Sequence, residues 1–76
     1  MEKISKYSIK RDNRVILYDI EDLDFILKVY YTLLKEEKNS FVWYDLTEDI
    51  YDNDVLYNSI DRISARAKGK EIEKWK

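Results

Sequence analysis

One segment constrains the fold of this chain more than any other, because apolar residues between positions 20 and 38 recur at helical spacing. They fall three or four positions apart, at Leu23, Ile26, Leu27, Tyr30, Leu33 and Leu34. This spacing places them along one face of an α-helix. Asp19 or Asp22 can cap its first turn, and Asn39 can end it in a left-handed conformation. The sequence therefore predicts a helix over Ile20–Lys38 whose apolar face must be covered by other elements.

The residues before this helix predict a β-hairpin. Tyr7 and Ile9 alternate with polar residues within Ile4–Lys10, and Arg14–Asp19 contains a β-branched and aromatic run of strand length. The segment between them contains Asp12-Asn13. Asp and Asn tolerate the left-handed conformation that tight hairpin turns require, so no glycine is needed there.

The segment Ser40–Leu46 predicts a strand with apolar side chains on both faces. One face carries Val42, Tyr44 and Leu46, and the other carries Phe41 and Trp43. A strand of this kind is expected at the centre of a sheet, or with one aromatic face covered by another element.

A second helix is predicted over Asn53–Lys68. Its apolar positions follow helical spacing, at Leu56, Ile60, Ile63 and Ala67. Asp52 is expected to cap its start, and Gly69, the single glycine of the chain, stands where a helix commonly ends. Lys70–Lys76 leaves three alternatives open: a short extra strand, an extra helical turn or a mobile tail.

The predicted element order is therefore β-β-α-β-α in a single α+β domain covering residues 1–76. We expect a three-stranded mixed sheet with both helices packed on one face. The right-handed crossover rule would place the third strand beside the first. Since the chain of 76 residues contains no cysteine, its stability must come from this core, with homodimerisation as a further way to bury apolar area.

Composition argues against several classes of function. The chain has no histidine, no cysteine, no glycine-rich phosphate loop and one glycine, so we expect no enzyme, no metal site and no cofactor. Asp52-Asn53-Asp54 resembles the opening of a calcium loop, but the glycine and the closing glutamate that such a loop requires are missing. No apolar stretch is long enough to span a bilayer, and no signal peptide is visible, so a cytoplasmic location without a membrane partner is expected.

Charge is divided into three blocks along the chain. Residues 1–18 carry a net charge of +3, residues 19–54 carry −8 and residues 55–76 carry +3. Capping of two helix starts explains part of the acidic block. If the second and third strands run parallel, both helix starts lie at one end of the domain, and their carboxylates merge into one negative patch. The predicted partner-binding residues of this patch are Glu21, Asp22, Asp24, Trp43, Asp45, Glu48, Asp49, Tyr51, Asp52 and Asp54.

Such a patch predicts a small, non-enzymatic inhibitory or regulatory protein. It would bind a basic, nucleic-acid-binding site on a protein partner, such as a nucleic-acid-processing enzyme, in place of phosphates. Aromatic side chains would anchor the contact. By analogy of class, this size and charge suit phage or mobile-element proteins with anti-defence or anti-CRISPR-like roles.

Two alternatives stay open. A nucleic-acid-binding module would use the basic second helix and the N-terminal hairpin, with Phe41 and Trp43 as a stacking platform. Its contact residues would be Arg11, Arg14, Arg62, Arg66, Lys68 and Lys70. A homo-oligomeric structural subunit would instead hide Trp43 and Phe41 against a second copy of the chain.

Overall fold

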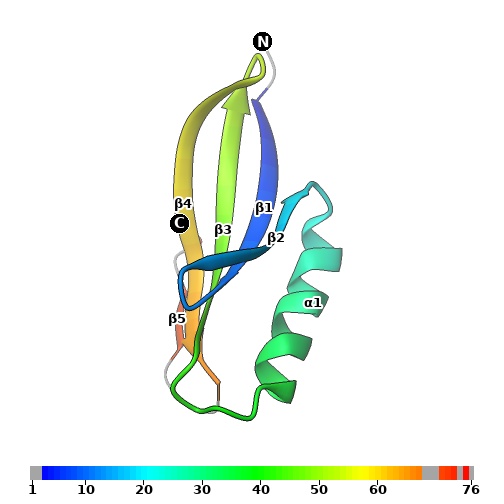
Figure 1. Ribbon diagram of the computed structural model, residues 1–76. Coiled ribbons are helices and arrows are strands. Elements are labelled where there is room, and N and C mark those ends of the chain that lie inside the picture. The colour runs from blue at the N-terminus through cyan, green and yellow to red at the C-terminus, as the bar shows by residue number, and fades with distance from the viewer. Residues whose placement is uncertain (1–2, 68–70, 74, 76) are drawn as a thin grey trace.

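An antiparallel β-sheet with one helix on one face makes up the fold in the computed structural model, which describes residues 3–67, 71–73 and 75 (Figure 1). Its elements are β1 (Lys3–Arg11), β2 (Arg14–Ile20), α1 (Leu23–Glu36), β3 (Trp43–Asp52), β4 (Val55–Arg66) and β5 (Glu71–Glu73). The strand order is β2-β1-β3-β4-β5, and every neighbouring pair is antiparallel.

The second half of the predicted fold is wrong. Four long antiparallel strands and one helix replace the expected three-stranded mixed sheet with two helices. Instead of a second helix over Asn53–Lys68, the chain turns back at Asn53-Asp54 and forms β4 against β3. Both turn residues have positive φ, 51° and 67°, as a two-residue hairpin of the I′ type requires. Asp52 therefore ends a strand and caps no helix, while Lys68 and Gly69 lie outside the described residues.

Two β-bulges explain why the apolar residues of β4 have the sequence spacing of a helix. Tyr57 and Arg62 each form an extra position in β4, because the residues on either side of them pair with consecutive residues of β3. An extra residue shifts the alternation of side chains by one position. Apolar residues three and four positions apart, such as Leu56, Ile60 and Ile63, can therefore arise in a strand. They do not share one buried face, since Leu56 is 54% exposed and Ile63 only 1% exposed.

The N-terminal hairpin is confirmed. β1 and β2 are joined by Asp12-Asn13, whose φ angles of 49° and 68° are left-handed. The third strand lies beside the first as expected, with Ile9 opposite Leu46. Because β1 is antiparallel to both neighbours, β2 and β3 run in the same direction with β1 between them.

The predicted apolar face of α1 is also confirmed. Ile26 and Tyr30 are fully buried against the sheet, with the other members of the stripe packed around them. Asp22 caps the helix, since its Oδ1 accepts a hydrogen bond from the Phe25 N–H at 3.1 Å. The expected terminator at Asn39 is wrong, because the helix ends earlier. The cap there is Glu37, with φ of −68°, and its N–H donates to the Leu33 carbonyl at 3.0 Å.

The end of α1 is held to the sheet by a polar cluster of Arg11, Glu37 and Tyr44. Arg11 Nε lies 2.9 Å from Glu37 Oε1, and the Tyr44 hydroxyl donates to the same oxygen at 2.6 Å. These hydrogen bonds, from Arg11 first and Tyr44 second, lower the pKa of Glu37 to about 2. Deeper in the core, the Tyr30 hydroxyl donates to the Tyr44 carbonyl at 2.7 Å. The helix is therefore fixed by polar contacts as well as by its apolar stripe.

The helix covers only part of the sheet. In Figure 1 the β3–β4 turn and the start of β1 beside it project beyond the start of α1, and the molecule measures 43 × 20 × 19 Å. Every residue from Asn53 to Ser59 is exposed. We call this projecting part, residues 3–5, 50–52 and 55–59, the distal end of the sheet. The distal end exposes apolar side chains and backbone groups that are not part of the core.

Candidate protein-binding face

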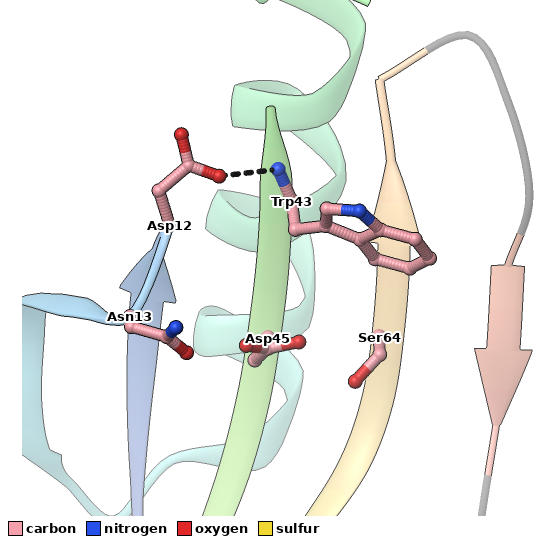
Figure 2. Close-up of a pocket in the computed structure, with 5 residues that line it drawn as sticks. All are labelled: Asp12, Asn13, Trp43, Asp45 and Ser64. Atoms are coloured by element: carbon pink, nitrogen blue, oxygen red, sulfur yellow. Dashed lines mark hydrogen bonds between the residues drawn. The ribbon is translucent and has the colours of Figure 1, made fainter. Parts of the chain in front are cut away.

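The sheet has one face that α1 does not cover, and we call it the open face. Tyr44 and Leu46 of β3 point into the core beneath the helix. Side chains alternate along a strand, so residues of odd number in β3 point the other way. They are Trp43, Asp45, Thr47, Asp49 and Tyr51. Figure 2 shows Trp43 and Asp45 on the near side of the sheet with α1 behind it.

The neighbouring strands place basic residues beside this acidic and aromatic row. Lys6 of β1 lies opposite Asp49, Lys10 lies opposite Asp45, and Arg66 of β4 lies opposite Trp43. The basic blocks of the sequence thus flank the acidic block across the sheet. Opposite charges in such cross-strand pairs stabilise a sheet. The basic side chains of β1 and β4 therefore separate the carboxylates of the −8 block and partly neutralise their charge. These carboxylates do not form one negative surface.

A hollow of about 530 Å³ lies at one end of the open face, where the β1–β2 turn meets the start of β3 (Figure 2). It is lined by Asp12, Asn13, Trp43, Asp45 and Ser64. Asp12 fixes this arrangement through two hydrogen bonds to the Trp43 backbone. Its Oδ1 accepts from the backbone N–H of Trp43 at 2.9 Å, and its own backbone N–H donates to the Trp43 carbonyl at 2.8 Å. The hollow is therefore lined by the Trp43 indole and the Asp45 carboxylate, and two hydrogen bonds to the Trp43 backbone hold Asp12 beside them.

The carboxylates of the open face differ in what they bind. Asp49 accepts a hydrogen bond from Ser59 Oγ at 2.7 Å, and Asp61 accepts one from Thr47 Oγ1 at 2.9 Å. Asp45 is only partly exposed, yet its carboxylate makes no hydrogen bond or ion pair with any described residue. A partly buried carboxylate without a partner loses hydration without compensation. Asp45 is thus the acidic group of this face that remains available to a ligand.

The guanidinium of Arg66 lies 5.9 Å from the centre of the Trp43 ring. A cation at this distance above an indole is attracted to the ring. The contact holds the ring at the edge of the hollow, where it can serve as an anchor.

The structure separates the predicted partner-binding residues into three groups. Trp43, Asp45, Asp49 and Tyr51 share the open face. Glu48 points to the helix side, where it accepts from Ser5 Oγ and lies 2.8 Å from Arg62 Nε. The remaining ones lie at the distal turn or at the start of α1, namely Asp52, Asp54, Glu21, Asp22 and Asp24.

The prediction of one merged patch is wrong, because its two halves lie on different sides of the sheet. Asp22 caps α1 on the covered side, whereas Asp49 is on the open face. The second helix start that the merged patch required does not exist.

Those residues of the alternative nucleic-acid surface that the structure describes do not lie on one face either. Arg11 pairs with Glu37 and Arg62 with Glu48, both on the helix side. Arg66 lies on the open face beside Trp43, and Arg14 begins β2 at the edge of the sheet. Lys68 and Lys70 lie outside the described residues.

Sequence reasoning missed Asp12, Asn13 and Ser64 as parts of the site. The sequence predicts Asp12-Asn13 only as a turn, although a third strand antiparallel to the first brings that turn beside Trp43. Ser64 falls within the predicted second helix, and only the pairing of β3 with β4 places it next to Asp45.

Within residues 3–67, 71–73 and 75, no group of three histidine, cysteine, aspartate or glutamate residues is arranged to hold a metal ion. The one helix found in this part of the chain is too short and too polar to cross a membrane. Comparison with known proteins gives no significant match to any family model, any curated protein or any solved structure.

Proposed function

We propose that this protein is a small, non-enzymatic binding protein that docks its open face onto a basic site of a protein partner and thereby inhibits or regulates it. One observation carries the proposal. β3 presents Trp43, Asp45, Asp49 and Tyr51 on the open face, each partly exposed and divided into two pairs by the buried Thr47, and the Asp45 carboxylate has no partner among the described residues. Nucleic-acid-processing enzymes offer the lysine and arginine surfaces that such a row suits.

The hollow supplies the centre of this contact. An arginine or lysine side chain of the partner can enter beside the Trp43 indole and reach the Asp45 carboxylate. Aromatic residues are enriched at the anchors of interfaces, and a charge pair shielded from water contributes more than an exposed one. Lys10 lies opposite Asp45 and competes for it, so fit to the hollow rather than long-range attraction selects the partner.

The experiment compares two neutralising variants that each remove one negative charge. Asp45→Asn acts in the hollow, whereas Glu36→Gln acts on the exposed end of α1 and serves as the matched control. Immobilised wild type and both variants are used to capture proteins from a lysate, and captured proteins are quantified by mass spectrometry. A candidate partner is then purified and titrated by calorimetry.

We expect the partner to bind wild type and Glu36→Gln equally and to lose at least tenfold in affinity for Asp45→Asn. Circular dichroism of the variants checks that the fold is unchanged. Equal affinity of Asp45→Asn and wild type, with both folded, would refute a role for the open face.

A further inference from the structure

The hollow at the β1–β2 turn is lined by polar groups that the protein itself does not use. The side chains of Asn13, Asp45 and Ser64 make no hydrogen bond with any described residue. Asp12 uses only Oδ1, which accepts from the backbone N–H of Trp43, and its other carboxylate oxygen has no partner among these residues. Four side chains of the hollow therefore have acceptor oxygens that remain available to a ligand.

These oxygens line one space together with the Trp43 ring (Figure 2). Asp45 and Ser64 lie opposite each other on β3 and β4, and Asn13 stands on the β1–β2 turn beside β3. Arg66 already contacts the Trp43 ring at 5.9 Å from its centre, and Trp43 stays partly exposed, so a second cation can also reach the indole. A group that enters the hollow thus meets an aromatic ring and oxygens from three elements of the fold.

Charge around the hollow is balanced. Asp12 and Asp45 contribute two negative charges, and Lys10 and Arg66 on the neighbouring strands contribute two positive ones. Among the described residues, neither Lys10 nor Arg66 forms an ion pair with these carboxylates. Because the two signs nearly cancel, a point charge gains little from long-range attraction here. Hydrogen bonds and stacking at short range therefore decide what binds.

We infer that the hollow accepts an arginine side chain of the protein partner in preference to a lysine. The inference rests on the function proposed for the open face and names the residue that the partner supplies. A guanidinium has five N–H donors in one plane, so it can bond to both oxygens of Asp45 and to further acceptors around it. It also stacks on aromatic rings and is more weakly hydrated than an ammonium group. A lysine brings three donors on a compact, strongly hydrated charge, which the balanced charge around the hollow does not favour.

A nuclear magnetic resonance titration measures this preference without a partner. The probes are N-acetyl-arginine methylamide and N-acetyl-lysine methylamide, each added up to 200 mM at constant ionic strength to isotope-labelled wild type. The indole N–H signal of Trp43, assigned with Trp43→Phe, and the backbone amides of Asn13 and Ser64 report binding in the hollow. We expect the arginine probe to bind about tenfold more tightly, which is the effect of one additional hydrogen bond to a charged group.

Two pairs of variants locate the preference. Asp45→Asn should weaken the binding of both probes, whereas Glu36→Gln removes a negative charge from the end of α1 and should change neither. Ser64→Ala should lower the affinity for the arginine probe several-fold and leave that for the lysine probe nearly unchanged. Ser40→Ala is its matched control, because it removes the same hydroxyl from an exposed residue outside the hollow.

Equal or tighter binding of the lysine probe, an absence of binding, or shift changes that spare Trp43, Asn13 and Ser64 would overturn the inference. Tighter binding of free L-arginine than of the blocked probe would also overturn it, because the hollow would then recognise a free amino acid. The proposed function is decided separately, by the affinity of a captured partner for Asp45→Asn. A hollow without a preference for arginine, in a protein whose partner still requires Asp45, would refute the inference alone.

Discussion

Truncating two leucines of neighbouring strands provides a direct test of the register of β4. Leu46 of β3 is fully buried, whereas Leu56 of β4 is 54% exposed. The helical interpretation of residues 53–68 made Leu56 a core residue, and the strand makes it a surface residue. Leu46→Ala and Leu56→Ala therefore remove the same atoms from two environments that only the observed fold distinguishes.

The expected magnitudes differ several-fold. A buried leucine truncated to alanine costs about 2–5 kcal/mol, because it loses transfer free energy and leaves a cavity. Full burial of a leucine side chain contributes about 1.5–3 kcal/mol, so one that is half-exposed should lose under about 1 kcal/mol. A domain of 76 residues has a free energy of unfolding of about 4–11 kcal/mol. Leu46→Ala should therefore remove a large part of the total stability.

Urea unfolding followed by far-UV circular dichroism measures both losses. Low micromolar protein keeps self-association out of the result. We expect the unfolding midpoint of Leu56→Ala to stay close to that of wild type and the midpoint of Leu46→Ala to fall steeply. If the two variants lost equal stability, the register that pairs β4 with β3 would be wrong.

Two further predictions concern the polar contacts that hold α1. The pKa of Glu37 is lowered to about 2, so its contribution to stability is present above its ordinary pKa of 4.5 and is lost as the pH falls toward 2. The difference in stability between wild type and Glu37→Gln should therefore be largest near pH 6 and vanish near pH 2; a difference that persisted in acid would contradict the assignment. Tyr30→Phe removes the buried hydrogen bond to the Tyr44 carbonyl and should cost about 1–3 kcal/mol in thermal or urea unfolding, and an unchanged midpoint would show that the bond contributes nothing.

The first half of the fold could be predicted because its signals are local. Asp12-Asn13 specifies a tight turn, and the stripe through Ile26 and Tyr30 specifies a helix. The two-faced run Ser40–Leu46 indicates a central strand, but β3 begins only at Trp43 and continues to Asp52. Each signal depends on neighbours within a few positions, and tertiary packing did not override them.

The second half could not be predicted from the same signals. The bulges at Tyr57 and Arg62 arise from pairing with β3, and no local spacing shows them. Because the bulges shift the side-chain alternation, the apolar residues of β4 fall at the spacing of a helix. Asn53-Asp54 has the same chemistry as Asp12-Asn13, but Asp52 just before it suggests a helix cap. Treating both pairs as hairpin turns would have predicted β4.

The candidate site was predictable only in part. The alternation of residues 43 to 51 puts Trp43, Asp45 and Asp49 on one face of any straight strand, and this was within reach of the sequence. The charged residues that lie opposite these three side chains are set by the register of β3 with β1 and β4. Summing charge along the chain therefore predicted a negative patch, whereas the folded sheet sets Lys10 against Asp45.

In two hairpins of this fold, β1–β2 and β3–β4, the strands are joined by turns of two residues, Asp12-Asn13 and Asn53-Asp54. Many proteins acquire new specificity by lengthening the loops above a conserved scaffold. These two turns have no spare length, so we expect a change of target at either turn to come from substitutions on the strands that they join. Natural variants with altered specificity should therefore differ by single side chains and keep the same chain length in these hairpins.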